Sequence, residues 1–328
     1  MRYALALCCL LMLLSGCGGS RPPQPRAETE VRGPALPGRL LFVRDGTIWQ
    51  WREQTAEAIL GDGEAFQPAF SPDGRRIVFV ARRNGASELM LADQNGAVER
   101  QLTTNSANEP PGSLERVYTS RWVFYPGWAP DGRTIVAAAQ PAPPEGDPPA
   151  DYRLGLTIFS ADGNPPARLA IEEGADYGRS AYGPDGTLVF VRAAAGPAGS
   201  QQIYRLEADG AVAPLPGAPP SSYDPAFSRD GNLLAFAAGE NNQTDIYVLL
   251  AGSATPRRLT DSGRARAPAF APDGSMLAFL AIAPGGAGFD LWVAAISSDD
   301  AGSIRLDTPQ RLTTDAYIDA DSGLSWAP

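Results

Sequence analysis

The sequence contains no histidine and no lysine, and its three cysteines, Cys8, Cys9 and Cys17, all fall within the first 17 residues. Beyond that point the chain cannot assemble a Ser-His-Asp or Cys-His nucleophile, a Schiff base or a Cys/His zinc site. It has no disulfide there either, so the burial of apolar strands must supply its stability. Carboxylates, hydroxyls, Tyr and Arg are the groups left for chemistry.

Positive charge is also scarce. The 328 residues include 27 Arg against 37 Asp and Glu, which gives a net charge of −10 at pH 7, and there is no basic run. Nucleic acids and anionic membrane surfaces attract basic proteins, so we expect neither as a partner.

The first residues are ordered as in a secretory signal. Arg2 precedes an apolar run from Ala4 to Leu14, which is too short to span a bilayer and has the form of a signal-peptide core. The next residues, Leu14-Ser15-Gly16-Cys17, resemble the lipobox of bacterial lipoproteins. That resemblance implies cleavage after residue 16 and a lipid on Cys17; the alternative is an ordinary signal peptide in which Cys17 has no role.

Residues 17–38 are rich in Gly, Pro and charge and show no apolar period, which is typical of an extended linker. The sequence therefore predicts a signal peptide (1–16), a lipidated flexible tether (17–38) and one domain (39–328). Several acyl chains would hold this domain outside the cytoplasm on the bacterial cell membrane.

One phrase recurs through that domain. It is PAFSPDG at Pro68–Gly74, and variants follow at 128–132, 182–186, 225–231 and 268–274, before the chain ends on SWAP. Asp-Gly is typical of a tight hairpin turn, and Pro suits the exit from a strand. Successive copies lie 43 residues (229 to 272) to 58 residues (72 to 130) apart. This is close to the length of a four-stranded propeller blade, about 40–50 residues, with some insertions.

Counting these copies predicts six blades. Their inner strands end at one aromatic residue each: Phe70, Trp128, Tyr182, Phe227, Phe270 and Trp326. The first blade has predicted strands at 40–44, 47–51 and 56–60 but no inner strand, whereas Leu324–Ala327 is an inner strand without a blade. The predicted fold is therefore an all-β, six-bladed β-propeller, whose ring is closed when the C-terminal strand joins the N-terminal blade.

Two further signatures accompany the turn. Third strands begin with D-I-Y at Asp245 and D-L-W at Asp290, and fourth strands end with R-L-T at 257–260 and 310–313. Together with the SPDG turn, these motifs resemble the WD40-like repeats of TolB-type six-bladed propellers, from about residue 38 to the end. The resemblance implies the fold and leaves the function open, because this propeller serves many roles. The signature aspartates are expected to be structural, as turn formers or backbone partners.

Two long loops, 103–127 and 140–152, belong to the blade of Trp128. Long loops on a rigid scaffold often carry function, and aromatic residues with Arg are typical of binding sites. We hypothesise that these loops form a lip beside the channel mouth and bind a partner or a glycan. The alternative is that the aromatic residues fill space beneath a lid. The candidate binding residues are Arg116, Tyr118, Arg121, Trp122 and Tyr125.

A weaker candidate site is the segment DADSG at residues 319–323, in which Asp319 and Asp321 have the opening spacing of a Ca²⁺ loop. It lacks the third ligand and the final Glu, so a turn is the favoured interpretation. No cofactor is expected.

Enzyme families fit the sequence poorly. The turns do not match the S-x-D-x-G-x-x-W repeat of sialidases, and residues 178–182 lack the second Gly of a nucleophile elbow. We expect a monomeric, non-catalytic binding or scaffold propeller that engages an envelope protein. The alternative is a propeller that binds a glycan or, less favoured, hydrolyses one with a pair of carboxylates.

Overall fold

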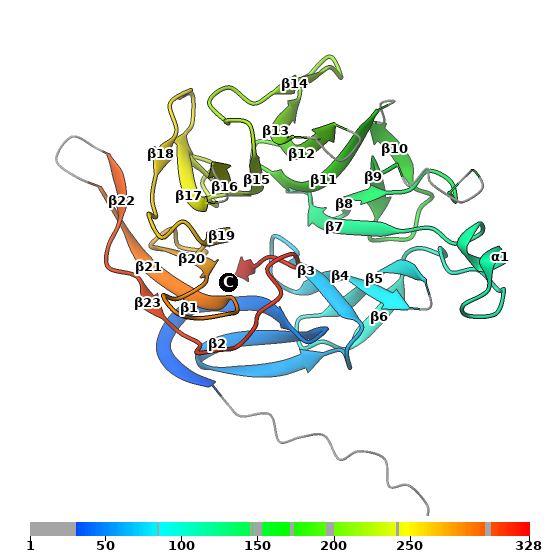
Figure 1. Cartoon of the computed structure of the whole chain (residues 1–328), viewed down its shortest axis with the longest axis horizontal. Helices are drawn as coiled ribbons and strands as arrows, with labels where there is room; N and C mark the ends of the chain where they lie inside the picture. Colours follow the sequence, from blue (N-terminus) through cyan, green and yellow to red (C-terminus); the bar gives the residue numbers. More distant parts are fainter. Residues whose placement is uncertain are drawn as a thin grey trace, which may run out of the picture.

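The computed structural model describes residues 31–83, 85–144, 146, 153–170, 174–194, 200–240, 243–298 and 303–328, and the structural statements below concern these ranges. Six antiparallel sheets are arranged in a ring around a common axis (Figure 1). The predicted six-bladed propeller is confirmed. Five inner strands end at the repeated aromatic residue, and the C-terminal strand ends one residue after Trp326.

The strands follow one another from the axis outward within each blade. Blade 1 contains β24 (Ser325–Ala327), β1 (Val31–Arg44) and β2 (Thr47–Leu60). Blade 2 contains β3 (Ala65–Phe70), β4 (Arg76–Arg83), β5 (Ala86–Asp93) and β6 (Val98–Gln101). Blade 3 contains β7 (Val123–Trp128), β8 (Thr134–Ala139), β9 (Gly155–Ser160) and β10 (Ala167–Ala170).

The remaining blades follow the same plan. Blade 4 contains β11 (Ala175–Tyr182), β12 (Leu188–Ala194), β13 (Gln201–Leu206) and β14 (Val212–Pro214). Blade 5 contains β15 (Ser222–Phe227), β16 (Leu233–Glu240), β17 (Gln243–Leu250) and β18 (Arg257–Arg258). Blade 6 contains β19 (Ala265–Phe270), β20 (Met276–Ala281), β21 (Asp290–Ser298), β22 (Ile304–Leu306) and β23 (Gln310–Arg311). A short helix, α1 (Leu114–Val117), precedes β7.

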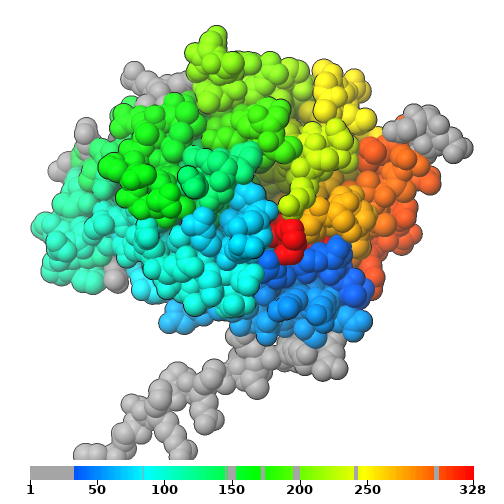
Figure 2. All heavy atoms as spheres, turned by 180° about the vertical axis from the view of Figure 1, so that it is seen from behind, coloured from blue at the N-terminus to red at the C-terminus, as the bar shows by residue number. Residues whose placement is uncertain are grey.

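The C-terminal strand closes the ring, as predicted. Strand β24 pairs with β1 so that Trp326 lies opposite Leu40, and the Trp326 indole donates a hydrogen bond to the carbonyl of Pro37 at 2.6 Å. Figure 2 shows the C-terminal end, in red, against the blue N-terminal blade. The first and last parts of the domain therefore form one sheet.

Blade 1 differs from the prediction in two ways. Strand β1 begins at Val31, so residues 31–38 are strand and not tether. The predicted strands at 47–51 and 56–60 are one continuous strand, β2. The cause is an extension of the hairpin, in which Val31 pairs with Ala56 beyond two register shifts in β1. Gly and Pro near residue 38 concealed this extension in the sequence, because they mark irregularities inside the strand and not a linker.

Packing between blades explains why the second strands are apolar on both faces. Residues 77–81 of β4 are all buried, and one hydrophobic cluster joins Ile77 and Phe79 to Leu41 and Val43 of blade 1. A propeller sheet is covered on both sides by its neighbours, so it needs apolar residues at odd and even positions alike.

The turn aspartates are structural, as expected. In blade 2 the Asp73 carboxylate accepts a hydrogen bond from the Ser71 hydroxyl at 2.6 Å and from the Arg75 amide at 3.1 Å. These two bonds lower the pKa of Asp73, in that order of strength. Equivalent turn bonds hold the aspartates of the other four copies, and their pKa values are lowered as well: Asp131, Asp185, Asp230 and Asp273.

The D-I-Y, D-L-W and R-L-T signatures form hydrogen-bonded networks around a buried aspartate. Asp290, which is 1% exposed, accepts hydrogen bonds from the Thr313 hydroxyl (2.9 Å), the Ala316 amide (3.0 Å) and the Arg311 guanidinium (2.6 Å). Asp245 is held in the same way by Arg258, Thr260 and the Gly263 amide. The R-L-T motif therefore supplies side-chain donors to the carboxylate of the adjacent strand. The sequence predicted only the backbone part of this arrangement.

Within the described ranges, no helix combines the length and apolar character that crossing a membrane requires.

Candidate functional site

The inner strands bring one residue from each blade to the same level around the axis. Each lies three positions before the repeated aromatic residue, and we call the set the bulge ring: Gln67, Tyr125, Arg179, Asp224, Ala267 and Gly323. In strands β3, β7, β11, β15 and β19 the register with the second strand shifts at this level. A β-bulge of this kind re-aims a side chain.

Backbone conformation marks the bulge ring as well. Gln67, Tyr125, Asp224 and Ala267 all have φ between 52° and 54°. Residues with a Cβ rarely occupy this left-handed region, and such strain persists only where the surrounding structure enforces it.

An ion-pair network joins three blades at the bulge ring. Asp224, 5% exposed, accepts hydrogen bonds from Arg179 of β11 at 3.2 Å and from Arg266 of β19 at 2.9 Å. Arg266 also donates a hydrogen bond to the Asp321 carboxylate at 2.8 Å. Burial alone would lower the pKa of Arg266, but the carboxylates of Asp224 and Asp321 outweigh it and hold that pKa above its usual value. The network fixes blades 4, 5 and 6 to the segment before β24.

Tyr125 belongs to this ring. The Arg179 guanidinium lies 5.0 Å from the centre of the Tyr125 ring, and the Tyr125 amide donates a hydrogen bond to the Gln67 side chain at 2.8 Å. Burial raises the pKa of the Tyr125 hydroxyl. This predicted binding residue therefore faces the propeller axis together with groups that the sequence did not single out.

The other predicted lip residues lie along residues 103–122. Arg116 is buried, and its guanidinium donates to the Glu109 carbonyl at 2.5 Å. Tyr118 is half-buried at the C-cap of α1, and Arg121 donates to the Thr104 carbonyl at 3.4 Å. Trp122 stacks on Phe124 at 5.7 Å, and Phe124 in turn contacts Tyr125 at 6.0 Å. The aromatic residues are thus linked to one another, whereas Arg116 holds the loop together.

Part of the second long loop, at residues 145 and 147–152, falls outside the described residues.

The weak Ca²⁺ candidates are engaged in other contacts. Asp319 accepts hydrogen bonds from the Asp321 amide and the Ser322 hydroxyl, which is the turn that the sequence favours. The Asp321 carboxylate pairs with Arg266. Among the described residues, no group of three or more acidic, His or Cys side chains is placed to hold a metal ion.

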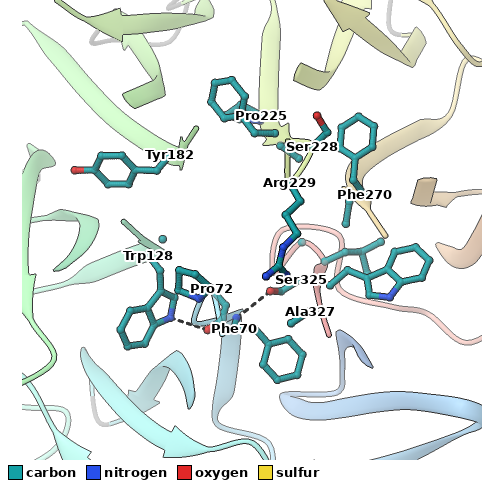
Figure 3. A pocket seen from close by; sticks show the side chains of 18 of the residues that line it. Phe70, Pro72, Trp128, Tyr182, Pro225, Ser228, Arg229, Phe270, Ser325 and Ala327 are labelled. Carbon is teal, nitrogen blue, oxygen red and sulfur yellow. Dashed lines mark hydrogen bonds between the residues drawn. The ribbon is translucent and has the colours of Figure 1, made fainter. Parts of the chain in front are cut away.

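A cavity of about 460 Å³ occupies the channel on the side of the SPDG turns. The paired Arg179 and Asp224 lie at one end of its lining, and the turn prolines lie at the other. Residues from all six inner strands line the space between them, with aromatic and proline side chains beside polar groups (Figure 3). The sequence predicted a site in the loops 103–127 and 140–152, away from the SPDG turns, so this cavity was missed.

Three wall residues depart from the repeat. Ser180 and Leu324 occupy the position of Pro68, Pro126, Pro225 and Pro268 in the other blades, and Arg229 occupies the position that is Pro in all five others. The signal was present in the sequence, because aligning the copies exposes these departures. What the sequence could not show is that Ser180 and Arg229 line one cavity.

Comparison with solved structures bears out the fold. TolB from Acinetobacter baumannii is 18% identical, with a TM-score of 0.64 over 89% of this chain and 67% of that chain. A TolB structure from Agrobacterium tumefaciens is 16% identical, with a TM-score of 0.52 over 85% of this chain and 89% of the other. A structure of a nidogen/laminin complex is 13% identical, with a TM-score of 0.54 over 88% of this chain and 97% of that chain. The chain therefore has the six-bladed propeller fold found in TolB.

Sequence comparison adds one curated relative. The uncharacterized peptidase YuxL of Bacillus subtilis is 26% identical over 212 residues, which are 62% of this chain. The match covers only 27% of YuxL. No protein-family model matches the sequence.

Proposed function

We propose that this protein is a non-catalytic, extracytoplasmic binding propeller that is held on the bacterial cell membrane by a lipid on Cys17 and engages an envelope protein. The observation that carries the binding role is an exposed apolar projection before β7, formed by the loop that carries helix α1. Helix α1 exposes Leu114 (60%) and Val117 (37%), two of the few large apolar residues that are exposed within the described ranges.

The projection is held in place by its own polar contacts. The Ser113 hydroxyl accepts a hydrogen bond from the Arg116 amide at the start of α1, and Thr119 donates to Glu109 at 3.0 Å. At the base of the loop, the Glu88 carboxylate accepts hydrogen bonds from the amides of Asn105 and Ser106. Apolar side chains on a pre-ordered support lose little entropy on binding, which favours a protein partner. The similarity of the fold to a chain in a nidogen/laminin complex is consistent with a role in protein binding.

Enzyme names occur among the similar proteins, including the peptidase YuxL and an oligogalacturonate lyase in complex with manganese. The lyase is 14% identical, and the chain spans about a quarter of YuxL, so neither likeness assigns an activity. His is the most frequent general base in enzymes and the sequence has none, and we therefore favour binding over catalysis.

Replacing Leu114 and Val117 together by Asp should abolish capture of the partner. The two carboxylates would have to be desolvated in an apolar contact, which is costly. Capture is measured by cross-linking in intact cells, followed by purification of the full-length protein. Val98→Asp is the matched control, because Val98 is equally apolar, 52% exposed and lies on β6, away from α1. Equal recovery of the same adduct from all three proteins would contradict a partner site on α1.

Replacing Cys17 by Ser should release the protein from the membrane fraction. A thioether-linked lipid cannot form on Ser, and the acyl chains are the proposed anchor. The measurement is the distribution between membrane and soluble fractions, with Cys8→Ser and Cys9→Ser as controls that leave the lipobox intact. An unchanged membrane share in Cys17→Ser, or release by either control, would overturn the lipid anchor.

A further inference from the structure

We propose that the channel cavity on the SPDG side binds a small organic carboxylate with an apolar body, and that Arg229 receives its carboxylate group. This site is independent of the partner site on α1. Strand β7 runs from the loop that carries α1 toward the SPDG-type turn at 128–132, so the two sites lie at opposite ends of the inner strands.

The first argument is the repeat itself. The four other turns and the truncated copy at the C-terminus place Pro where the blade 5 copy has Arg229, and Pro is the residue that suits this turn position. Five neighbouring copies show that the fold does not need a cation there. Ser180, another departure, lies on the adjacent blade 4 and lines the same cavity.

The second argument is that Arg229 is free. Its side chain extends from the end of β15 toward Ser325 across the cavity (Figure 3). Nothing within the described ranges forms an ion pair or hydrogen bond with its guanidinium. Two other arginines near the turns are engaged: Arg39 donates to the carbonyls of Gly74 and Pro328, and Arg76 donates to that of Gly132.

The neighbouring carboxylate, Asp230, forms no ion pair with Arg229 in the part of the chain that the structure describes. The Asp230 carboxylate accepts hydrogen bonds from the Ser228 hydroxyl at 2.6 Å and the Asn232 amide at 3.0 Å, both within its own turn. The guanidinium thus presents its donors to the channel. A guanidinium matches the planar, two-oxygen geometry of a carboxylate.

The third argument is the character of the cavity. Its volume of about 460 Å³ lies within the usual range for small-molecule sites. The walls include Trp128, Tyr182, Phe227 and Phe270, which suit an apolar or aromatic body.

The same walls disfavour a sugar. Each hydroxyl of a pyranose needs a polar partner, but most of the wall hydroxyls are already committed. Ser71 donates to Asp73, Ser228 donates to Asp230, and Ser325 accepts from the Phe70 amide. The committed serine hydroxyls therefore favour an acid with few hydroxyl groups over a glycan.

The probes are 3-phenylpropionate and its neutral amide, 3-phenylpropanamide, added to the full-length protein in detergent at pH 7. Binding is measured by calorimetry and by the fluorescence of the tryptophans, two of which line the cavity. We expect saturable binding of the acid and at least about tenfold weaker binding of the amide, as the loss of one charge-assisted contact implies. Ala226→Leu, which fills the cavity, should weaken both.

Arg229→Pro is the decisive variant. It restores the residue that the other five copies carry, so the turn and the melting temperature should be unchanged. It should lower the affinity for the acid to that for the amide. Arg133→Gln, which removes an exposed charge beside another turn, should leave both affinities as they were. The proposal is overturned if the acid does not bind, if Arg229→Pro binds it as the unaltered protein does, or if trigalacturonate binds more tightly than the acid.

Discussion

Replacing Asp224 by Ala is expected to lower the free energy of unfolding by about 3–5 kcal/mol, because removing one partner of a buried ion pair leaves its counter-charges uncompensated. The Asp224 side chain is 6% exposed, and those of Arg179 and Arg266 are 18% and 22% exposed. Its carboxylate also accepts the Ala267 amide at 3.2 Å. The measurement is urea-induced unfolding at pH 7, followed by tryptophan fluorescence.

Asp321→Ala is the matched control. Asp321 pairs with the same Arg266 at 2.8 Å, but its side chain is 67% exposed, so solvent already screens the pair. Its loss should cost at most about 1 kcal/mol. Asp224→Asn tests the effect of removing the charge alone. Asn tolerates the φ of 52° at this position and keeps a hydrogen-bond acceptor, so backbone strain should not change. If Asp224→Ala and Asp321→Ala cost the same, the network does not stabilise the ring as we describe.

The SPDG turns and the number of blades could be predicted from the sequence because these turns are formed by local contacts. Each SPDG turn is made by residues within five positions of one another, such as Ser71, Asp73 and Arg76. The spacing of these turns predicted six inner strands, and it implied that the last one, β24, closes the ring. The boundary at residue 38 failed for the opposite reason, since the pairing of Val31 with Ala56 depends on register shifts that composition does not reveal.

The bulge ring was not predictable in the same way. Arg179, Asp224 and Arg266 lie more than 40 residues apart in sequence and meet only because three bulges fall at one level of the ring. The loop aromatics illustrate a related limit. The sequence placed Trp122 and Tyr125 together on the lip, whereas the bulge in β7 directs Tyr125 to the axis beside Arg179. Among the residues that line the channel cavity, those that depart from the repeat, such as Arg229, could have been found by aligning the copies of the repeat with one another.

Deleting residues 325–328 is expected to cost at least about 5 kcal/mol of stability, because it removes the inner strand of blade 1. The deletion removes the Trp326 side chain and four side-chain hydrogen bonds. These bonds run from the Trp326 indole to the Pro37 carbonyl, from the Phe70 amide to the Ser325 hydroxyl, and twice from the Arg39 guanidinium to the Pro328 carbonyl. The melting temperature should fall by about 10–20 °C for a domain of this size. Circular dichroism at 218 nm on heating measures this shift.

Trp326→Phe is the control that separates the stability gained from closing the ring from that of the single hydrogen bond made by the Trp326 indole. Phe keeps most of the apolar contact with the cluster of blades 1 and 6 but cannot donate to the Pro37 carbonyl. The cost should then be about 1 kcal/mol, the net contribution of one hydrogen bond. If the deletion costs no more than Trp326→Phe, the ring does not depend on β24, and blades 2 to 6 would be stable as an open arc. A much larger cost for the deletion would show that β24 links the two ends of the domain into one cooperative unit.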